Sequence, residues 1–219
     1  REFSRIGLSD MAIRDFSRAL EARPGYVEVL ISRGDEYGRK GLTEKAIADY
    51  TSVISHNPSQ KETYLKRGVE YEKSGKVDEA IADFTGALER DPLWVDAYLH
   101  RAHAYWVAGK YEESVQDSTK ACEIDHKNTE AFLQRGMSHS AMDRSSEAIV
   151  DFTRAIEVDP RCHEAYFRRG QVYSNSGRSE EAVGDFTSAI HLNENVRETY
   201  IARAAEYGQS GRNGEAVSD

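Results

Sequence analysis

The sequence has little of what disulfide-rich, membrane-spanning or nucleic-acid-binding proteins need. Its 219 residues include two cysteines, Cys122 and Cys162, which form no CxxC pair and no disulfide framework. We therefore expect a reducing, intracellular setting, most simply the cytoplasm, with an organelle or cilium left open. No apolar run approaches the length that crosses a bilayer, and the first residues lack the apolar core of a signal peptide. A net charge of −9 argues against a nucleic-acid partner, which calls for a clustered basic surface.

Proline is also scarce, and its positions are regular. The chain has four prolines, and all are separated by 34 residues or by twice 34: Pro24, Pro58, Pro92 and Pro160. Glycines follow the same period, with an aspartate standing in once: Gly41, Gly75, Gly109, Asp143, Gly177 and Gly211. A fixed period over the whole chain indicates stacked repeats, not one globular core.

Residues 61–94 form the clearest repeat. Small and apolar residues share one helical face twice, at Tyr64, Gly68 and Tyr71 and again at Ala80, Phe84 and Ala87. Gly75 lies between the two runs, where a left-handed conformation can close a helix. Asp91 and Pro92 end the second run, because the residue before a proline is disfavoured in a helix. The spacing thus predicts two helices of about 14 residues, each roughly 20 Å long.

In these positions the chain resembles the tetratricopeptide repeat family. The family pattern is an aromatic, a small residue four positions later and a tyrosine, then an alanine, a second aromatic and a proline. Within the family, this chain looks like a subfamily with Arg-Gly in the first helix and Asp-Phe-Thr in the second. The resemblance implies an all-α, right-handed superhelical solenoid of antiparallel helix pairs with a concave inner face. It also implies that the function is binding, without catalysis.

The period sets the predicted repeat boundaries. Residues 1–26 are a partial repeat, in which 1–8 end one helix and 9–22 form a second. The later units are 27–60, 61–94, 95–128, 129–162, 163–196 and the truncated 197–219. Repeat 95–128 is degenerate, because Ser114 and Ser118 replace a core alanine and aromatic and His126 replaces the proline. Partial repeats at both ends suggest a segment of a longer array.

Two charged positions recur as faithfully as the apolar ones. The arginines are Arg33, Arg67, Arg101, Arg135, Arg169 and Arg203, and the aspartates include Asp49, Asp83, Asp117, Asp151 and Asp185. Each arginine is level with the aspartate 16 residues later and with the one 18 residues earlier, and spacing alone does not choose between them. We expect a structural ladder of partly buried ion pairs, in preference to a functional row of exposed arginines.

No catalytic, cofactor or metal site is predicted. His163 and Glu164 begin a string like that of a zinc protease, but Phe167 occupies the place of the second histidine. His100, His103 and His139 could meet, yet the spacing supplies no carboxylate to orient them. The expected class is therefore not an enzyme.

The candidate binding residues come from the positions that line the groove in the resembling family. The fifth position of each first helix is apolar, which fits packing between neighbouring helices as well as an exposed partner site. The second position is always acidic and gives the groove an acidic rim. A large aromatic, Trp106, stands where other repeats have small or polar residues, and it either anchors a partner or covers its own weakened core. The predicted partner-binding set is Leu65, Val69, Leu99, His103, Trp106, Leu133, Met137 and Phe167.

The favoured function is a protein–protein interaction scaffold that holds a peptide or helix of a partner along the groove. One alternative is a co-chaperone-type module that clamps a C-terminal carboxylate, which the acidic second positions disfavour. Another is the substrate-recruiting arm of a larger enzyme, whose asparagine ladder is missing here. Other proteins are the expected partners, without nucleic acid, membrane or cofactor, and exposed ends of the array leave room for oligomers.

Overall fold

The computed structural model describes residues 2–209, with side chains from 8 to 208, and every element in that range is a helix. The chain divides into two compact units, Arg1–Gly109 and Lys110–Asp219, which are described separately below. The first unit contains α1 (Glu2–Ala22), α2 (Val27–Arg39), α3 (Thr43–His56), α4 (Lys61–Lys73), α5 (Val77–Arg90) and α6 (Val95–Val107). The second contains α7 (Tyr111–Ile124), α8 (Thr129–Ala141), α9 (Ser145–Val158), α10 (His163–Asn175), α11 (Ser179–Leu192) and α12 (Arg197–Gln209).

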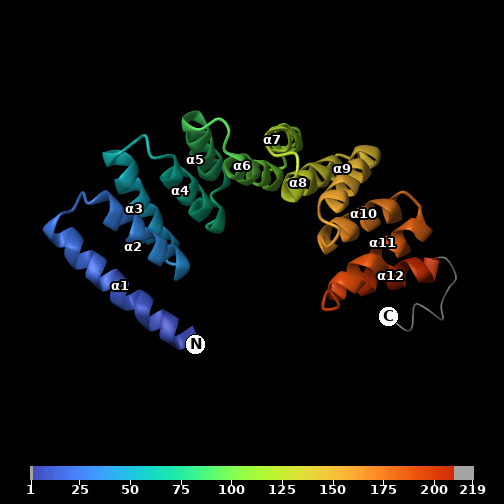
Figure 1. The fold of residues 1–219 in the computed structure, drawn as a ribbon, viewed down its shortest axis with the longest axis horizontal. Coiled ribbons are helices and arrows are strands. Elements are labelled where there is room, and N and C mark those ends of the chain that lie inside the picture. Colours follow the sequence, from blue (N-terminus) through green and yellow to red (C-terminus); the bar gives the residue numbers. More distant parts are fainter. Residues whose placement is uncertain (1, 210–219) are drawn as a thin grey trace. The chain divides into compact units, whose positions relative to one another are not determined.

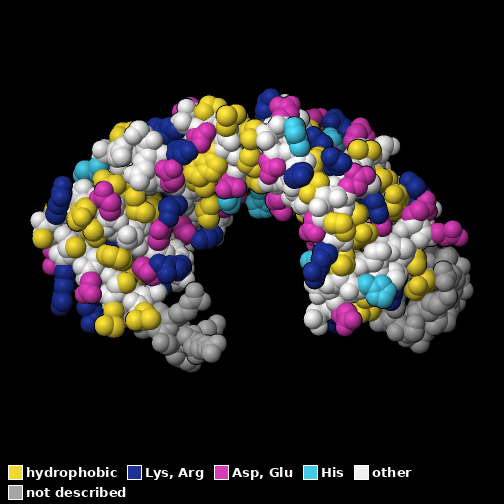
Figure 2. Space-filling view, in the orientation of Figure 1, with side chains coloured by type: hydrophobic (Ala, Val, Ile, Leu, Met, Phe, Trp, Pro, Cys, Tyr) yellow, Lys and Arg dark blue, Asp and Glu magenta, His cyan; other side chains and the backbone are white. Residues whose placement is uncertain are grey.

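Within each unit, helices that are consecutive in the sequence pack side by side (Figure 1). The predicted all-α stack of helix pairs is confirmed. No helix in the described range is both long and apolar enough to span a bilayer. On the face drawn in Figure 2, acidic and basic side chains are interspersed among apolar ones in both units, which fits a stack two helices thick.

Left-handed residues close the first helix of a repeat, as the glycine series predicts. Gly41, Gly75, Gly109 and Gly177 have φ between 70° and 73°, and Asp143 has φ of 58°. After α4, the Gly75 N–H donates to Glu72 O at 3.0 Å and the Lys76 N–H donates to Tyr71 O at 2.9 Å. These bonds satisfy carbonyls that the helix end would leave unpaired.

The second helix of a repeat ends in an Asx turn, with or without a proline. The backbone of Asp91 is extended, and its Oδ1 accepts the Leu93 N–H at 3.1 Å. In the repeat that lacks proline, Asp125 Oδ1 accepts the Lys127 N–H at 3.0 Å in the same way. The aspartate therefore supplies the stop by itself, since its side chain competes for a backbone donor.

The prediction for the N-terminal residues is wrong. Residues 1–8 and 9–22 were expected to belong to two helices, but Glu2–Ala22 is one continuous helix of 21 residues. A turn between helices is held by packing of the two helices on each other, and α1 packs only on α2 in the described range. Continuing a helix that has already formed adds one hydrogen bond per residue, which favours a single helix over a turn.

A glycine facing an aromatic ring brings the two helices of a repeat together. A Cβ added to Gly68 would lie 2.5 Å from Phe84 Cε1, and one added to Gly136 would lie 2.7 Å from Phe152 Cε1. Gly34 meets Tyr50 and Gly170 meets Phe186 in the same way. Rings that are buried against bare helix backbone leave no space for any side chain at these glycines.

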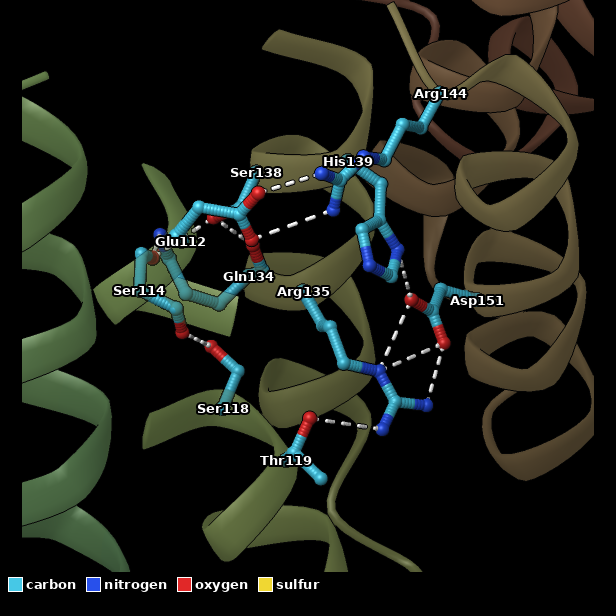
Figure 3. Close-up of polar contacts among 10 residues, drawn as sticks. All are labelled: Glu112, Ser114, Ser118, Thr119, Gln134, Arg135, Ser138, His139, Arg144 and Asp151. Carbon is cyan, nitrogen blue, oxygen red and sulfur yellow. Dashed lines mark hydrogen bonds and ion pairs between the residues drawn. The ribbon is translucent and has the colours of Figure 1, made fainter. Parts of the chain in front are cut away.

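The boundary between the two units falls in the turn of the degenerate repeat, between Gly109 and Lys110. Here Ala102 takes the glycine position and Ser118 the aromatic position, and both are fully buried. In the second unit, serines form a hydrogen-bonded cluster in which the Oγ atoms of Ser114 and Ser138 are 2.7 Å apart (Figure 3). Ser118 Oγ donates to Ser114 O at 2.8 Å, so the buried hydroxyls are satisfied.

Candidate functional site: the arginine ladder and the first-helix face

We call the recurring arginines of the first helices the ladder arginines. In four repeats, the ladder arginine pairs with the aspartate 16 residues later, in the second helix of the same repeat. Arg67 donates from Nε and Nη2 to the two carboxylate oxygens of Asp83, both at 2.7 Å. The other three pairs are Arg33–Asp49, Arg135–Asp151 and Arg169–Asp185. The hydrogen bond to Asp83 outweighs burial and raises the pKa of Arg67. A two-pronged bond of this kind fixes the guanidinium plane as well as the charge.

The same guanidinium reaches back to the preceding repeat. Arg67 Nη1 donates to the Thr51 hydroxyl at 3.0 Å, so one side chain joins helices α3, α4 and α5. Every ladder arginine has such a bond to a hydroxyl 16 residues earlier, on Ser17, Thr51, Thr85, Thr119, Thr153 and Thr187. The threonine of the Asp-Phe-Thr motif thus serves the next repeat, while its aspartate serves its own.

Aromatic rings cover the faces of the guanidinium. The Arg67 Cζ lies 6.0 Å from the ring centre of Tyr64 and 5.8 Å from that of Tyr71, three residues before it and four after it. Arg101, Arg169 and Arg203 lie between two tyrosines at the same positions. Stacking on the ring faces adds a cation–π attraction to the ion pair.

Repeat 129–162 departs from this arrangement. Arg135 has Phe132 on one side at 5.6 Å, but the residue four positions later is His139 instead of tyrosine. His139 turns to the aspartate, with Nδ1 3.1 Å from Asp151 Oδ2 (Figure 3). Arg135 Nε lies 3.0 Å from both oxygens of Asp151, and its Nη2 lies 2.6 Å from Oδ1. One carboxylate therefore serves an imidazole as well as a guanidinium.

We call the surface formed by the first helices of the repeats the first-helix face. In the first unit, this face contains a polar pocket between α2 and α4. It measures about 420 Å³ and is lined by Asp35, Gly38, Arg39, Tyr50, Glu70 and Lys73. Asp35 accepts both Lys66 Nζ, at 2.6 Å, and the Tyr50 hydroxyl, at 2.7 Å. Burial and this bond raise the pKa of Tyr50, which keeps its proton and remains a donor.

Glu70 is a buried carboxylate in that pocket. Its residue is 4% exposed, and its Oε1 accepts Lys73 Nζ at 2.5 Å. The carboxylate lies over Gly38, where an added Cβ would be 2.7 Å from Oε1. Oε2 is buried and accepts no hydrogen bond within the described residues. Sequence reasoning missed this group, although a glutamate recurs at the same helical position in Glu36 and Glu206.

Two histidines of α6 share one carboxylate of α4. Glu72 lies 3.3 Å from His100 Nδ1 and 3.1 Å from His103 Nδ1. Burial opposes ionisation of Glu72, but the hydrogen bonds to the two histidines outweigh it and hold its pKa below the usual value. The ring of His100 also stacks on Phe84, with centroids 5.4 Å apart. Sequence spacing within α6 could not reveal this carboxylate, because it belongs to the preceding repeat.

The predicted partner-binding residues of the first unit differ in exposure. Leu65 and Val69 are half-buried and pack against the cluster of Ala80, Phe84 and Ala104. Leu99 and Trp106 are also half-buried, while His103 is exposed.

Those of the second unit lie on α8 and α10. Leu133 is only 7% exposed and belongs to the core, whereas Met137 and Phe167 are half-buried. Phe167 contacts Phe186 at 6.0 Å between ring centres. The eight predicted residues are thus divided between the two units. Among them, His103 is the one that is exposed.

Comparisons with known proteins agree with the repeat pattern. The family model described as Tetratricopeptide repeat matches residues 65–125 and 133–196, more than half of the chain. No curated protein sequence matches.

Several solved structures share the fold. A structure of a tetratricopeptide repeat protein from Parabacteroides merdae is 22% identical, with a TM-score of 0.80 over 98% of this chain and 85% of that one. A structure of MamA is 24% identical, with a TM-score of 0.70 over 77% and 92%. YrrB, whose structure is described as a TPR protein with an unusual peptide-binding site, is 21% identical, with a TM-score of 0.69 over 86% and 97%.

Proposed function

Because the chain belongs to the tetratricopeptide repeat family, we propose that it is an interaction scaffold that binds an extended peptide or a helix of a partner protein along its first helices. The observation that carries this proposal is the pocket between α2 and α4, with the buried Glu70 carboxylate on its wall. The Asp35 side chain on the same wall is 34% exposed and can accept a backbone N–H or a side-chain donor of a peptide. The description of YrrB as peptide-binding supports this class of partner.

The proposal also retains the predicted contacts around Trp106. His103 is exposed beside it, and Val107 on the same helix is 52% exposed. An aromatic side chain flanked by apolar and polar neighbours is typical of a binding anchor. Leu99 contributes less to this site because it is half-buried, and the predicted Leu133 lies in the core of the second unit.

We keep the proposed subfamily with Arg-Gly and Asp-Phe-Thr motifs for a physical reason. In this chain these motifs supply the arginine of the ladder, the glycine under the aromatic ring, and the aspartate and threonine that hold the guanidinium. These contacts hold neighbouring helices together before any partner binds. The first-helix face is therefore preorganised for binding.

The test is a screen of the full chain against an array of random 15-residue peptides, followed by calorimetry with the best binder. We expect Trp106→Ala to weaken binding at least 30-fold, which corresponds to about 2 kcal/mol. Leu93→Ala is the matched control, because Leu93 is 71% exposed and lies outside the first helices. It should leave affinity unchanged.

Two results would contradict the proposal. One is an array without any saturable binder. The other is a Trp106→Ala variant that melts earlier but binds as tightly as the parent, which would make Trp106 a core residue. Amidating the C-terminus of the bound peptide separates the carboxylate-clamp alternative, which alone predicts loss of affinity after that change.

A further inference from the structure

The repeats can be compared by the side chain that covers the guanidinium of the ladder arginine. In five repeats a tyrosine four residues after the arginine lies 5.6 to 6.0 Å from its Cζ: Tyr37, Tyr71, Tyr105, Tyr173 and Tyr207. Cationic side chains from the turn or the second helix cover several of these rings, as Arg178 does at 4.3 Å from Tyr173. The tyrosine is therefore a constant part of the arginine site.

In repeat 129–162 that ring is missing and a pocket is present. His139 has a smaller ring and is held at Asp151 by its Nδ1. A cavity of about 390 Å³ lies here among α7, α8 and α9, with Arg135, His139 and Asp151 on its wall. The Arg135 side chain is 22% exposed, against 16% for Arg67 and for Arg169 and 20% for Arg33.

The rest of the lining combines three polar residues, Thr119, Ser146 and Glu147, with two valines. Val115 and Val150 line the cavity, and Val150 is 66% exposed. At the position of Val150, other second helices hold Ala48, Ala82, Gln116 and Gly184, whereas the position of Val115 is apolar in other repeats too, as in Ile81 and Ile149. An exposed valine beside a guanidinium face gives a partner ring apolar contact on its edge and a cation under its plane.

We propose that this cavity is a docking site for an aromatic side chain, tyrosine or phenylalanine, of a partner protein, which takes the place of the missing tyrosine over Arg135. Charge complementarity selects the occupant: the negative face of an aromatic ring matches the guanidinium, whose Nε, Nη1 and Nη2 each already donate one hydrogen bond to Asp151 or Thr119. A carboxylate ligand would instead meet the like charges of Asp151 and Glu147 on the cavity wall.

This site shares no residue with the proposed first-helix face, so it stands or fails independently of the proposed function. Its residues lie on the second helices α7 and α9 and on the side of α8 that faces them. A partner could therefore occupy it while a peptide lies along the first helices.

The probe is p-cresol, the side chain of tyrosine, titrated into the full chain with ¹³C-labelled valine and isoleucine methyl groups. We expect saturable shift changes at the methyls of Val115 and Val150. His139→Tyr fills the cavity with the chain's own ring and should weaken binding at least tenfold. The saturated analogue 4-methylcyclohexanol has a similar size without an aromatic face, and it should bind at least tenfold more weakly than p-cresol.

A reciprocal variant keeps the test decisive if His139→Tyr folds poorly. Tyr173→His removes the ring from repeat 163–196, where Ile149 corresponds to Val115. It should create a second p-cresol site that shifts the Ile149 methyl. The proposal is overturned if p-cresol shifts neither valine, if binding survives His139→Tyr, or if the saturated analogue binds equally well.

Discussion

Arg67 and Arg135 occupy the same position in two repeats, but both covering side chains differ: Tyr64 and Tyr71 flank Arg67, where Arg135 has Phe132 and His139. Arg67 has a tyrosine on each face and a two-pronged bond to an aspartate that serves it alone. Arg135 shares Asp151 with His139, and its hydroxyl contact to Thr119 is longer, 3.4 Å against 3.0 Å for Arg67 and Thr51. The repeat with His139 thus has a shared aspartate, a longer hydroxyl contact and a cavity beside its arginine.

This difference shows what each part of the ladder contributes. The aspartate is present in both repeats and keeps the charge buried, so it carries the structural role. The covering tyrosine is the part that varies, and where His139 replaces it a cavity lies beside the guanidinium. A repeat protein can therefore change its surface by altering one covering residue while the ion pair maintains the fold.

The largest expected effect comes from removing the arginine itself. Arg67→Ala leaves Asp83, which is 5% exposed, without its ion pair and should cost about 3–5 kcal/mol of unfolding free energy. Arg135→Ala should cost about 1 kcal/mol less, because His139 still hydrogen bonds to Asp151. Urea unfolding of both variants measures the difference. Equal midpoints would mean that the histidine gives Asp151 no support.

A middle-sized effect should be the same in both repeats. Gly68→Ala and Gly136→Ala each place a Cβ within 3 Å of a buried phenylalanine ring and should cost about 1–3 kcal/mol. Gly184→Ala is the matched control, since an added Cβ there meets no atom within 4 Å, and it should stabilise the helix by about 0.5–1 kcal/mol. Thermal melts report all three. If Gly136→Ala leaves the melting temperature unchanged, the helices of repeat 129–162 are loosely packed at the glycine as well as at the arginine.

The smallest effect lies in the links between repeats. Thr51→Val removes the hydroxyl that accepts Arg67 Nη1 and should cost about 0.5 kcal/mol, since the site is exposed. Thr119→Val should cost less, because the corresponding bond is longer. Denaturant midpoints measured at unchanged slope compare the two. A larger cost for Thr119→Val would reverse the ranking of the two arginine sites.

Much of the fold was predictable because a strict period reports many positions at once. The helix pairs, the turn glycines and the repeated Arg and Asp positions all followed from residues 34 apart. The choice of aspartate did not follow, because a period places two carboxylates level with each arginine and only the packing of the helices selects one. The threonine contacts were missed for the same reason, since they join neighbouring repeats.

Other features depend on context that a pattern does not contain. Glu70 was overlooked because a glutamate on a charged helix is usually solvated, and its burial depends on Gly38 in the preceding repeat. The continuous helix α1 was not predicted either, because the 34-residue period placed a helix boundary after residue 8, where Glu2–Ala22 continues as one helix. Within the candidate site, exposure could not be predicted either: Leu133 has the same pattern position as Leu99 but lies in the core.

The most direct test of the account exchanges the covering residue between the two repeats. Tyr71→His should cost about 1 kcal/mol, because Arg67 loses one of its two rings. His139→Tyr should gain about 0.5–1 kcal/mol, because it fills the cavity and covers Arg135. Urea midpoints that move in opposite directions are the predicted result. If both variants are destabilised, each residue is adapted to its own repeat and the missing tyrosine does not explain the cavity.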